Sequence, residues 1–300
     1  MLPTYLILNP RSGRGRSEEL IPSIRDHFKA KNIPFDLHVT MCQGDATKVA
    51  AEMSKHYPIF VAAGGDGTVN EVVNGIAGTD CALGILPLGS GNDFARTLAY
   101  SKRLSNSLQS ITRQSIKTID LGYIEVVNSS GRTTEKFFIN SVGIGLDAQV
   151  AHEAGRISWV RGLAKYGIAA IKVLASYKAE ASTAISPEFE STGKHLLISI
   201  GNGKSSGGGF FLTPDAILDD GMLDVCLAKN LSMSEILRIF PFVLIGRHGR
   251  FGKIELKRTK KLSVASNTDL PVHVDGEVLG LDIREVRLEV KAAAIKVLVP

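Results

Sequence analysis

Gly64-Gly65-Asp66-Gly67-Thr68 follows the apolar run Ile59 to Ala63, which predicts a buried strand, and precedes the helix-like segment Thr68 to Ala77. Glycine lets the backbone approach an anion closely and adopt a positive φ. The amide N–H groups of the turn and the N-terminus of the helix supply positive potential. The stretch therefore predicts a strand, a turn and a helix arranged to bind phosphate.

Two other glycine-rich turns follow predicted strands in the same way. Asn9-Pro10-Arg11-Ser12-Gly13 comes after Tyr5 to Leu8, and Gly89-Ser90-Gly91-Asn92-Asp93 comes after Leu83 to Pro87. In an open α/β sheet such turns meet at the carboxyl ends of the strands, where ligands bind. One turn alone could be a simple connection, but three together favour convergent phosphate binding. None matches the Walker A loop or the Gly-x-Gly-x-x-Gly fingerprint.

Asp66 is an acid among glycines that are predicted to bind phosphate. Its carboxylate would repel the ligand unless it coordinates a metal bound to the phosphates or orients their surroundings. We therefore expect Mg²⁺ to accompany the phosphates, and we predict a catalytic role for Asp66.

The pattern of the chain changes near Asp120-Leu121-Gly122. Before this point short apolar runs alternate with amphipathic ones, which is typical of a parallel sheet with helices; Ser17 and Asp45 are the predicted N-caps of two helices. After it, runs such as Lys136 to Val142 are separated by Gly, Asn, Asp and Ser, which predicts antiparallel strands. Helices are predicted there at Ser158 to Tyr177 and Ser232 to Gly246. A ligand-binding cleft is expected where the two parts meet.

The bulk composition is that of a globular protein of two domains, with 300 residues, 44% apolar and 22% charged. The net charge of +5 suits nucleic acid, nucleotide phosphates or an anionic membrane, but no nucleic-acid reader motif accompanies it. The three cysteines are far apart, as in a cytoplasmic protein. The longest internal apolar run, Ile239 to Ile245, is far shorter than the roughly 20 residues of a membrane span, so we expect a soluble protein with at most peripheral membrane contact.

A series of motifs, in order over nearly the whole chain, resembles the bacterial diacylglycerol kinases, soluble lipid kinases related to the sphingosine and ceramide kinases. The motifs are Gly64-Gly65-Asp66-Gly67-Thr68-Val69-Asn70-Glu71, Pro87-Leu88-Gly89-Ser90-Gly91-Asn92-Asp93-Phe94, Asp120-Leu121-Gly122, Asn140-Ser141-Val142-Gly143, Leu218-Asp219-Asp220-Gly221-Met222 and Val274-Asp275-Gly276-Glu277. Gly-Gly-Asp-Gly alone is shared with NAD kinases and phosphofructokinases. The later motifs make the resemblance to lipid kinases specific.

The resemblance implies a two-domain fold of the α/β plus all-β class. An α/β nucleotide-binding domain with a parallel sheet would cover residues 1–121, with 288–300 returning to it, and an antiparallel β-sandwich that binds the lipid would cover 122–287. It also implies ATP contacts at Asn9, Pro10, Arg11, Ser12, Gly13, Thr40, Gly64, Gly65, Asp66, Gly67, Thr68, Val69, Asn70 and Ser90. Ser90 stands where many relatives have threonine, so a hydroxyl is kept.

Glu277 is the candidate general base. From its spacing alone, Asp275-Gly276 is better interpreted as the type I′ turn of a surface hairpin. The resemblance reverses this preference, because the glutamate of this motif serves as base in the family and would take the proton of the lipid hydroxyl.

A second Mg²⁺ site is implied at the Leu218–Met222 turn, with Asp219, Asp220 and the carbonyl oxygens of Ile217 and Met222 as ligands. Oxygen ligands suit a hard cation. The alternative is a solvated turn. Asp93 and Asp120 could each shape the nucleotide site or only cap a turn.

Trp159, Leu163, Tyr166, Ala170, Val173 and Tyr177 draw one apolar stripe on the predicted helix 158–177. It could lie on an anionic membrane, but packing against the protein's own sheet is the more common fate. We therefore expect an ATP-dependent kinase of a membrane lipid, most simply diacylglycerol. A kinase of a soluble acceptor such as NAD and a non-catalytic lipid or nucleotide sensor are the alternatives, and homodimer formation stays open.

Overall fold

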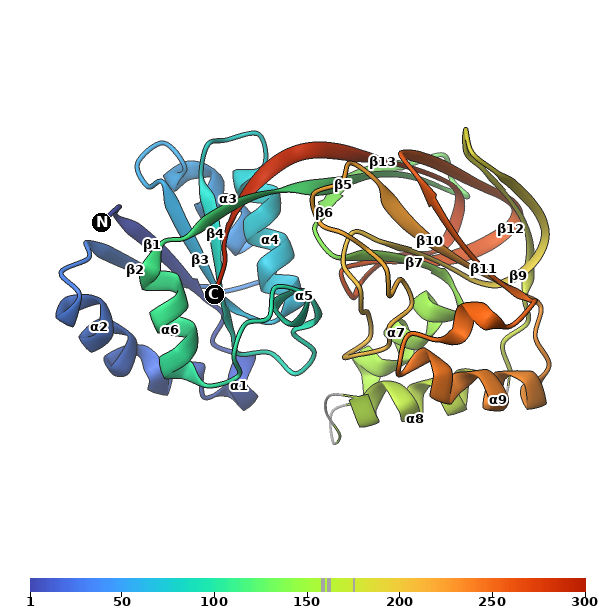
Figure 1. The fold of residues 1–300 in the computed structure, drawn as a ribbon, viewed down its shortest axis with the longest axis horizontal. Coiled ribbons are helices and arrows are strands. Elements are labelled where there is room, and N and C mark those ends of the chain that lie inside the picture. The colour runs from blue at the N-terminus through green and yellow to red at the C-terminus, as the bar shows by residue number, and fades with distance from the viewer. Residues whose placement is uncertain (158–159, 161–162, 175) are drawn as a thin grey trace. The chain divides into compact units, whose positions relative to one another are not determined.

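The computed structural model describes residues 1–157, 160, 163–174 and 176–300. The chain forms two compact units (Figure 1): unit 1 is residues 1–120 with 293–300, and unit 2 is residues 121–292. Two strands, β5 (Ile116–Asn128) and β13 (Glu277–Leu298), contain the points where the chain passes between the units. The predicted order, a mixed α/β domain followed by a β-rich one, is confirmed.

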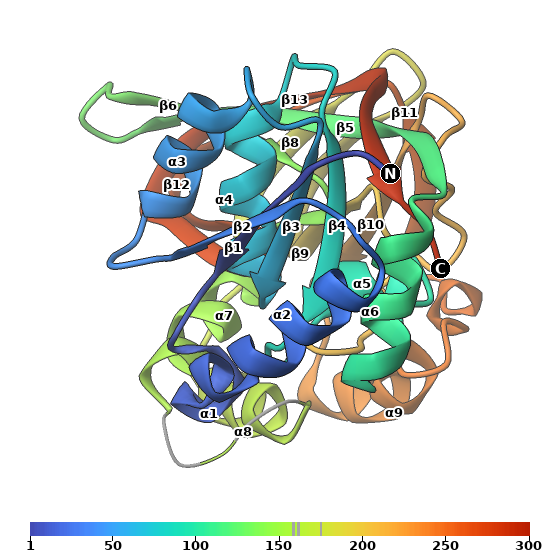
Figure 2. The same ribbon diagram turned by 90° about the vertical axis from the view of Figure 1, so that its left-hand side faces the viewer.

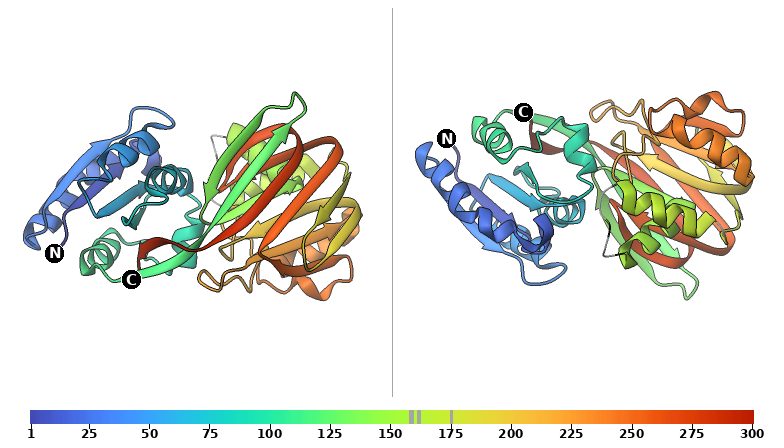
Figure 3. Two further views of the ribbon diagram at one scale, coloured as in Figure 1. Left: turned by 90° about the horizontal axis from the view of Figure 1, so that it is seen from above. Right: turned by 90° about the horizontal axis from the view of Figure 1, so that it is seen from below.

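Unit 1 is built on a sheet with the strand order β13-β4-β3-β1-β2 and parallel pairing between neighbours. Its other strands are β1 (Thr4–Leu8), β2 (Phe35–Val39), β3 (Ile59–Gly64) and β4 (Ala82–Pro87). Its helices are α1 (Ser12–Gly15), η1 (Ser17–Leu20), α2 (Ile21–Ala30), α3 (Asp45–Met53), α4 (Asp66–Ile76), α5 (Asp93–Thr97) and α6 (Leu104–Arg113). Figures 2 and 3 show α2 and α6 on one side of the sheet and α3 and α4 on the other. Both faces are thus covered, which explains why β3 is apolar throughout and wholly buried.

The two helix N-caps predicted in this unit are wrong. Ser17 lies inside η1, and its Oγ donates to the Asn9 carbonyl at 2.7 Å. Gly44 caps α3, because the backbone there takes a φ of +84° that favours glycine. Asp45 instead bonds to His38 Nε2 at 3.0 Å and accepts from the Met41 N–H at 2.9 Å, and these bonds lower the pKa of Asp45.

Unit 2 is an antiparallel array with the strand order β11-β10-β9-β7-β12-β13, in which β8 pairs with β9 and β12, and β6 pairs with β5. The strands are β6 (Thr133–Phe138), β7 (Ser141–Gly145), β8 (Glu180–Ile185), β9 (Glu190–Gly201), β10 (Leu223–Lys229), β11 (Ile254–Thr259) and β12 (Lys261–Val274). The single run predicted from Lys136 to Val142 is wrong, because Ile139 and Asn140 separate two strands with different partners.

Three helices lie on one side of the unit 2 strands (Figure 3): α7 (Leu146–Arg156), α8 (Leu163–Leu174) and α9 (Met233–Val243), followed by the short η2 (His248–Arg250). The sequence did not predict α7. Tyr166, Ala170, Val173 and Tyr177 pack with α7 and β9 in one apolar cluster, so this part of the predicted stripe faces the protein interior. Trp159 lies outside the described residues. No helix in the described ranges is long and apolar enough to cross a bilayer.

His195 gives unit 2 a pH-dependent stability. The side chain is buried on β9, with Ser182 Oγ 2.9 Å from Nδ1 and Ser191 Oγ 3.0 Å from Nε2, and burial lowers its pKa below 6.5. The unfolded chain therefore takes up a proton near pH 6.5 that the folded protein does not, so stability falls as the pH drops below that value. We expect His195→Gln to reduce this acid-induced fall in Tm, measured by calorimetry. Part of the fall should remain in the variant, because burial also lowers the pKa of His248. Equal slopes of Tm against pH in both proteins would contradict the assignment.

Candidate functional site

The three glycine-rich turns of unit 1 are joined to one another by direct hydrogen bonds. The Gly13 N–H donates to the Leu88 carbonyl at 2.8 Å, and the Gly89 N–H donates to the Gly64 carbonyl at 3.0 Å. Asn9 Nδ2 completes the set by donating to Thr68 Oγ1 at 3.1 Å. The turns that follow β1, β3 and β4 therefore form one continuous surface, as parallel strands with a common direction require.

Two of these turns touch through their backbones. A Cβ atom added at Gly89 would lie 2.4 Å from Gly65 Cα, and one added at Gly64 would lie 2.3 Å from Thr68 Oγ1. Neither position has room for a side chain. Part of the glycine content is thus explained by the packing of the turns themselves, and not only by the approach of a ligand.

Asp66 begins α4, where the positive end of the helix dipole favours a carboxylate. Its Oδ1 accepts a hydrogen bond from the Phe94 N–H, at 3.2 Å, in the first turn of α5. Asp66 therefore connects the second glycine turn to the helix that follows the third. This is a positioning contact that the sequence did not predict, and the role of Asp66 toward phosphate or metal stays a prediction.

The predicted ATP-contacting residues divide into exposed and buried groups. Arg11 and Ser90 are exposed, and Asn9, Pro10 and Ser12 are half-buried along the first turn, where the Arg11 N–H donates to Asn9 Oδ1. Thr40 lies just beyond β2, with its N–H bonded to the Leu8 carbonyl. Val69 and Asn70 are buried inside α4, beneath the turn. Their structural contribution is to support the turn, and their contact with ATP stays a prediction.

The two aspartates that the sequence left ambiguous have different positions. Asp93 pairs with Arg96 at 2.9 Å, and Arg96 also donates to the Gly91 carbonyl at 3.2 Å, so this pair shapes the third turn. Asp120 accepts from the Ala293 N–H at 2.8 Å. It anchors the returning end of the chain instead.

Glu277 follows a type I′ turn in unit 2, since Asp275 and Gly276 have φ values of +47° and +83° and Val274 pairs with Glu277. Its Oε2 lies 2.5 Å from Lys136 Nζ on β6. The Glu277 side chain is 29% exposed, so the carboxylate is held by a cation and still reaches the surface. Lys136 could not be predicted as the partner of Glu277, because it is 141 residues away in the chain.

Asp275 has a larger role than a turn residue. Its carboxylate is almost buried and accepts three backbone N–H bonds, from Ile139 at 3.0 Å, Asn140 at 3.0 Å and Ser141 at 2.8 Å. His273 Nδ1 accepts from the Gly276 N–H at 3.3 Å, and its Nε2 lies 3.2 Å from Asp147 Oδ2. These contacts fix the turn that carries Glu277.

The predicted cation turn is already engaged by protein groups. Asp220 Oδ1 accepts from the Met222 N–H at 3.1 Å, and Oδ2 pairs with Arg258, which also lies 3.6 Å from Asp224. The described residues contain no cluster of three or more His, Cys, Asp or Glu side chains suited to a metal, so backbone carbonyls would have to contribute. The carboxylate and carbonyl oxygens fit a hard cation chemically, and such a cation would compete with the Arg258 guanidinium for Asp220.

Both parts of the chain match known sequence families. Residues 3–124 match the diacylglycerol kinase catalytic domain, and residues 140–299 match the YegS C-terminal NAD kinase beta sandwich-like domain. The chain is 31% identical over 282 residues to a diacylglycerol kinase of Staphylococcus saprophyticus, covering 92% of this chain and 88% of the relative. It is 28% identical over 284 residues to a diacylglycerol kinase of Bacillus subtilis, covering 92% and 90%.

Two solved structures share the fold. A diacylglycerol kinase from Bacillus anthracis superposes with a TM-score of 0.73 at 21% identity, over 99% of this chain and 97% of the other. Yeast NADH kinase complexed with NADH superposes with a TM-score of 0.52 at 10% identity, over 100% and 84%.

Proposed function

Because the chain belongs to the diacylglycerol kinase family, we propose that it transfers the γ-phosphoryl group of ATP to the free hydroxyl of diacylglycerol, giving phosphatidic acid. The observation that carries this function is the direct bonding of the three glycine turns within the segment that matches the catalytic domain. A surface of amide N–H groups and helix N-termini is suited to a triphosphate.

Unit 1 supplies the nucleotide site in this proposal. The triphosphate lies along Asn9 to Gly13, Gly64 to Thr68 and Ser90, and Thr40 borders it. In the same proposal unit 1 is the nucleotide domain, and unit 2 is the lipid-binding domain, a β-sandwich. Positioning and electrostatic stabilisation supply most of the catalysis in phosphoryl transfer, which explains the need for rigid, mutually bonded turns.

Glu277 accepts the proton of the lipid hydroxyl as its oxygen bonds to the γ-phosphorus. The bond between this phosphorus and the bridging oxygen breaks, and ADP leaves. Lys136 holds the carboxylate in place. Mg²⁺ bound with ATP would supply positive charge to the phosphoryl oxygens, and Asp66 would orient this part of the site.

A second Mg²⁺ site at Ile217, Asp219, Asp220 and Met222 is part of the proposal. We expect Asp220→Ala to lower the melting temperature and to remove a Mg²⁺-dependent rise in Tm, because the variant loses the carboxylate ligand that the Met222 N–H orients. Arg258→Gln should raise the affinity of the site for Mg²⁺ and enlarge the Mg²⁺-dependent rise in Tm, since it removes the competing guanidinium. Identical metal titrations of Tm in all three proteins would eliminate the site.

The lipid acceptor implies contact with a membrane surface, and we place the enzyme in the cytoplasm. Its three cysteines, Cys42, Cys81 and Cys226, are unpaired in the structure, as is usual in a reducing compartment. The net charge of +5 favours anionic surfaces. Homodimer formation is an open element of the proposal.

A panel of acceptors tests the function. The purified protein is incubated with labelled ATP and Mg²⁺, and with diacylglycerol, phosphatidylglycerol, ceramide, a polyprenol, NAD or no acceptor. Labelled phosphatidic acid is the expected product. Transfer to NAD alone would select a soluble-acceptor kinase, the alternative that the shared Gly-Gly-Asp-Gly motif and the match of residues 140–299 leave open. Tight ATP binding without product under any condition would select a sensor.

A further inference from the structure

Helix α9 presents apolar side chains where a surface helix normally carries polar ones. Met233, Leu237 and Phe240 follow one another at helical spacings of four and three, and they are 45%, 66% and 38% exposed. Ile245, just after the helix, is 60% exposed. The other side of the helix is packed, because Ile239 is buried against β10 and Ile236 contacts the cluster formed by α7, α8 and β9. We call Met233, Leu237, Phe240 and Ile245 the α9 ridge.

Three arginines lie on α9 or in the segment that follows it. Arg238, Arg247 and Arg250 are exposed, and in the described part of the chain none of them forms an ion pair. Lys253, by contrast, is paired with Glu235 at 2.8 Å. The Arg250 guanidinium lies 4.8 Å from the centre of the Phe242 ring, and that of Arg238 lies 5.8 Å from the Phe251 ring. The aromatic contacts hold two positive charges at the protein surface, where no ion pair among the described residues compensates them.

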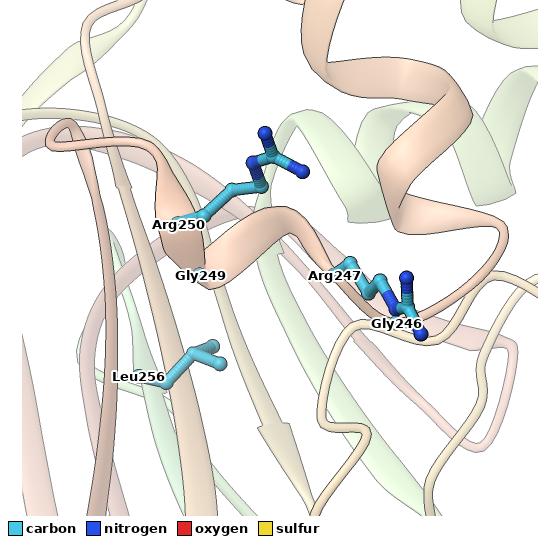
Figure 4. A pocket seen from close by; sticks show the side chains of 5 residues that line it. All are labelled: Gly246, Arg247, Gly249, Arg250 and Leu256. Atoms are coloured by element: carbon cyan, nitrogen blue, oxygen red, sulfur yellow. The ribbon is translucent and has the colours of Figure 1, made fainter.

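A pocket of about 410 Å³ opens between the turn after α9 and strand β11. Gly246, Arg247, Gly249, Arg250 and Leu256 line it (Figure 4). Leu256 reaches so close to Gly249 that a Cβ atom there would lie 2.7 Å from Leu256 Cδ1. The pocket therefore has an apolar wall next to two guanidinium-bearing residues, a combination suited to an anionic, amphipathic group.

We propose that the α9 ridge and its three arginines dock the protein on a bilayer that contains anionic phospholipid. The ridge enters the boundary between headgroups and acyl chains, while Arg238, Arg247 and Arg250 contact lipid phosphates and the pocket receives one headgroup. This inference rests on the proposed function, since it assigns a surface to the membrane contact that a lipid acceptor requires. The charge pattern favours a bilayer over a protein, because one surface supplies both an apolar layer and many phosphates.

Helix α8 does not offer an equivalent surface in its described residues. Its Tyr166, Ala170 and Val173 pack inward, and its one strongly exposed apolar side chain, Ile171, stands beside Lys172, which is paired with Glu153. In the described parts of these two helices, the row of strongly exposed apolar side chains belongs to α9.

Vesicle sedimentation without ATP or diacylglycerol tests the proposal independently of catalysis. Wild-type protein is expected to bind phosphatidylcholine vesicles that contain phosphatidylglycerol and to bind pure phosphatidylcholine weakly. Arg247→Gln with Arg250→Gln should weaken binding to the anionic vesicles by about 25-fold, or roughly fivefold for each charge. Leu237→Ser with Phe240→Ser should weaken it by about tenfold or more. Ile185→Ser and Arg132→Gln, exposed residues elsewhere in unit 2, are the matched controls and should bind like wild type.

A second measurement reports insertion directly. The chain has a single tryptophan, so the added fluorescence of Leu237→Trp can be separated from that of wild type. A blue shift with anionic vesicles is expected, and no shift would overturn insertion of the ridge. Wild-type-like sedimentation of both double variants would overturn the docking surface, as would a wild-type oligomer that the Leu237→Ser/Phe240→Ser variant converts to monomer, because the ridge would then bind a second copy of the chain.

Activity on a short-chain diacylglycerol dispersed without vesicles separates this inference from the proposed function. Both double variants should retain wild-type turnover there, since their residues lie outside the proposed catalytic machinery. Normal vesicle binding with no kinase activity toward any lipid would reject the proposed function and leave the docking surface supported. Loss of turnover on the dispersed lipid in step with vesicle binding would reject a pure docking role.

Discussion

Replacement of Glu277 by glutamine is expected to lower turnover by a factor of 10² or more while leaving ATP binding intact. Glutamine keeps the size and one hydrogen-bonding oxygen but cannot accept the proton of the lipid hydroxyl, and removal of a general base usually costs a factor of this size. The type I′ turn and the Asp275 hydrogen bonds do not depend on the Glu277 charge, so the fold should survive. Single-turnover kinetics with labelled ATP and calorimetric titration with ATP give the two values.

Two comparisons separate a base from a structural carboxylate. Glu190→Gln changes an exposed carboxylate of the same unit and should leave turnover unchanged. Lys136→Met removes the cation that holds Glu277. If Glu277 serves only to pair with this lysine, Glu277→Gln and Lys136→Met will lose turnover and stability equally. Near-normal turnover of Glu277→Gln would reject the base outright.

Gly89→Ala is expected to weaken ATP binding by at least tenfold and to lower the melting temperature. The new Cβ atom would lie 2.4 Å from Gly65 Cα and 2.7 Å from Asn92 Oδ1, so the second and third glycine turns must move apart. Such overpacking typically costs about 1–3 kcal/mol, and the displaced turns lose the Gly89 to Gly64 hydrogen bond. Thermal melting and titration with Mg²⁺–ATP measure both effects.

Gly67→Ala is the matched variant for this experiment. A Cβ atom at Gly67 meets no protein atom within 4 Å, and alanine is better than glycine in a helix such as α4 by up to about 1 kcal/mol. Its stability should therefore be kept or raised, while ATP affinity falls if the triphosphate occupies this space. Wild-type affinity in both variants would show that the glycine turns do not bind the nucleotide.

The fold of unit 1 could be predicted because its signals are local. Strands such as Ile59 to Gly64 are wholly apolar and end in glycine, so the apolar run and the turn residue that ends it lie within a few residues of each other. The helix caps at Ser17 and Asp45 failed because cap identity depends on backbone angles, and Gly44 alone accommodates the positive φ at the start of α3.

The candidate site could be predicted only in part, because its contacts join residues that are far apart in the chain. The glycine turns are visible as motifs, but the Asp66 bond to Phe94 is not. Asp275 binds backbone N–H groups 134 to 136 residues away. The same distance in sequence hid the break between β6 and β7, since the Asp275 carboxylate satisfies the N–H groups of Ile139 and Asn140 between them. A single sequence carries no signal for such pairs.

The return of the chain to unit 1 sets an order of assembly during synthesis. Lys296 and Val297 pair with β4, Tyr100 Oη donates to the Leu298 carbonyl at 2.9 Å, and the Val299 N–H donates to the Ser115 carbonyl at 2.8 Å. These partners emerge from the ribosome long before residues 293–300 do. The edge of β4 that pairs with β13 therefore stays unpaired until all of unit 2 has been translated. A nascent chain stalled anywhere before Ala293 would present this edge to chaperones or to other chains.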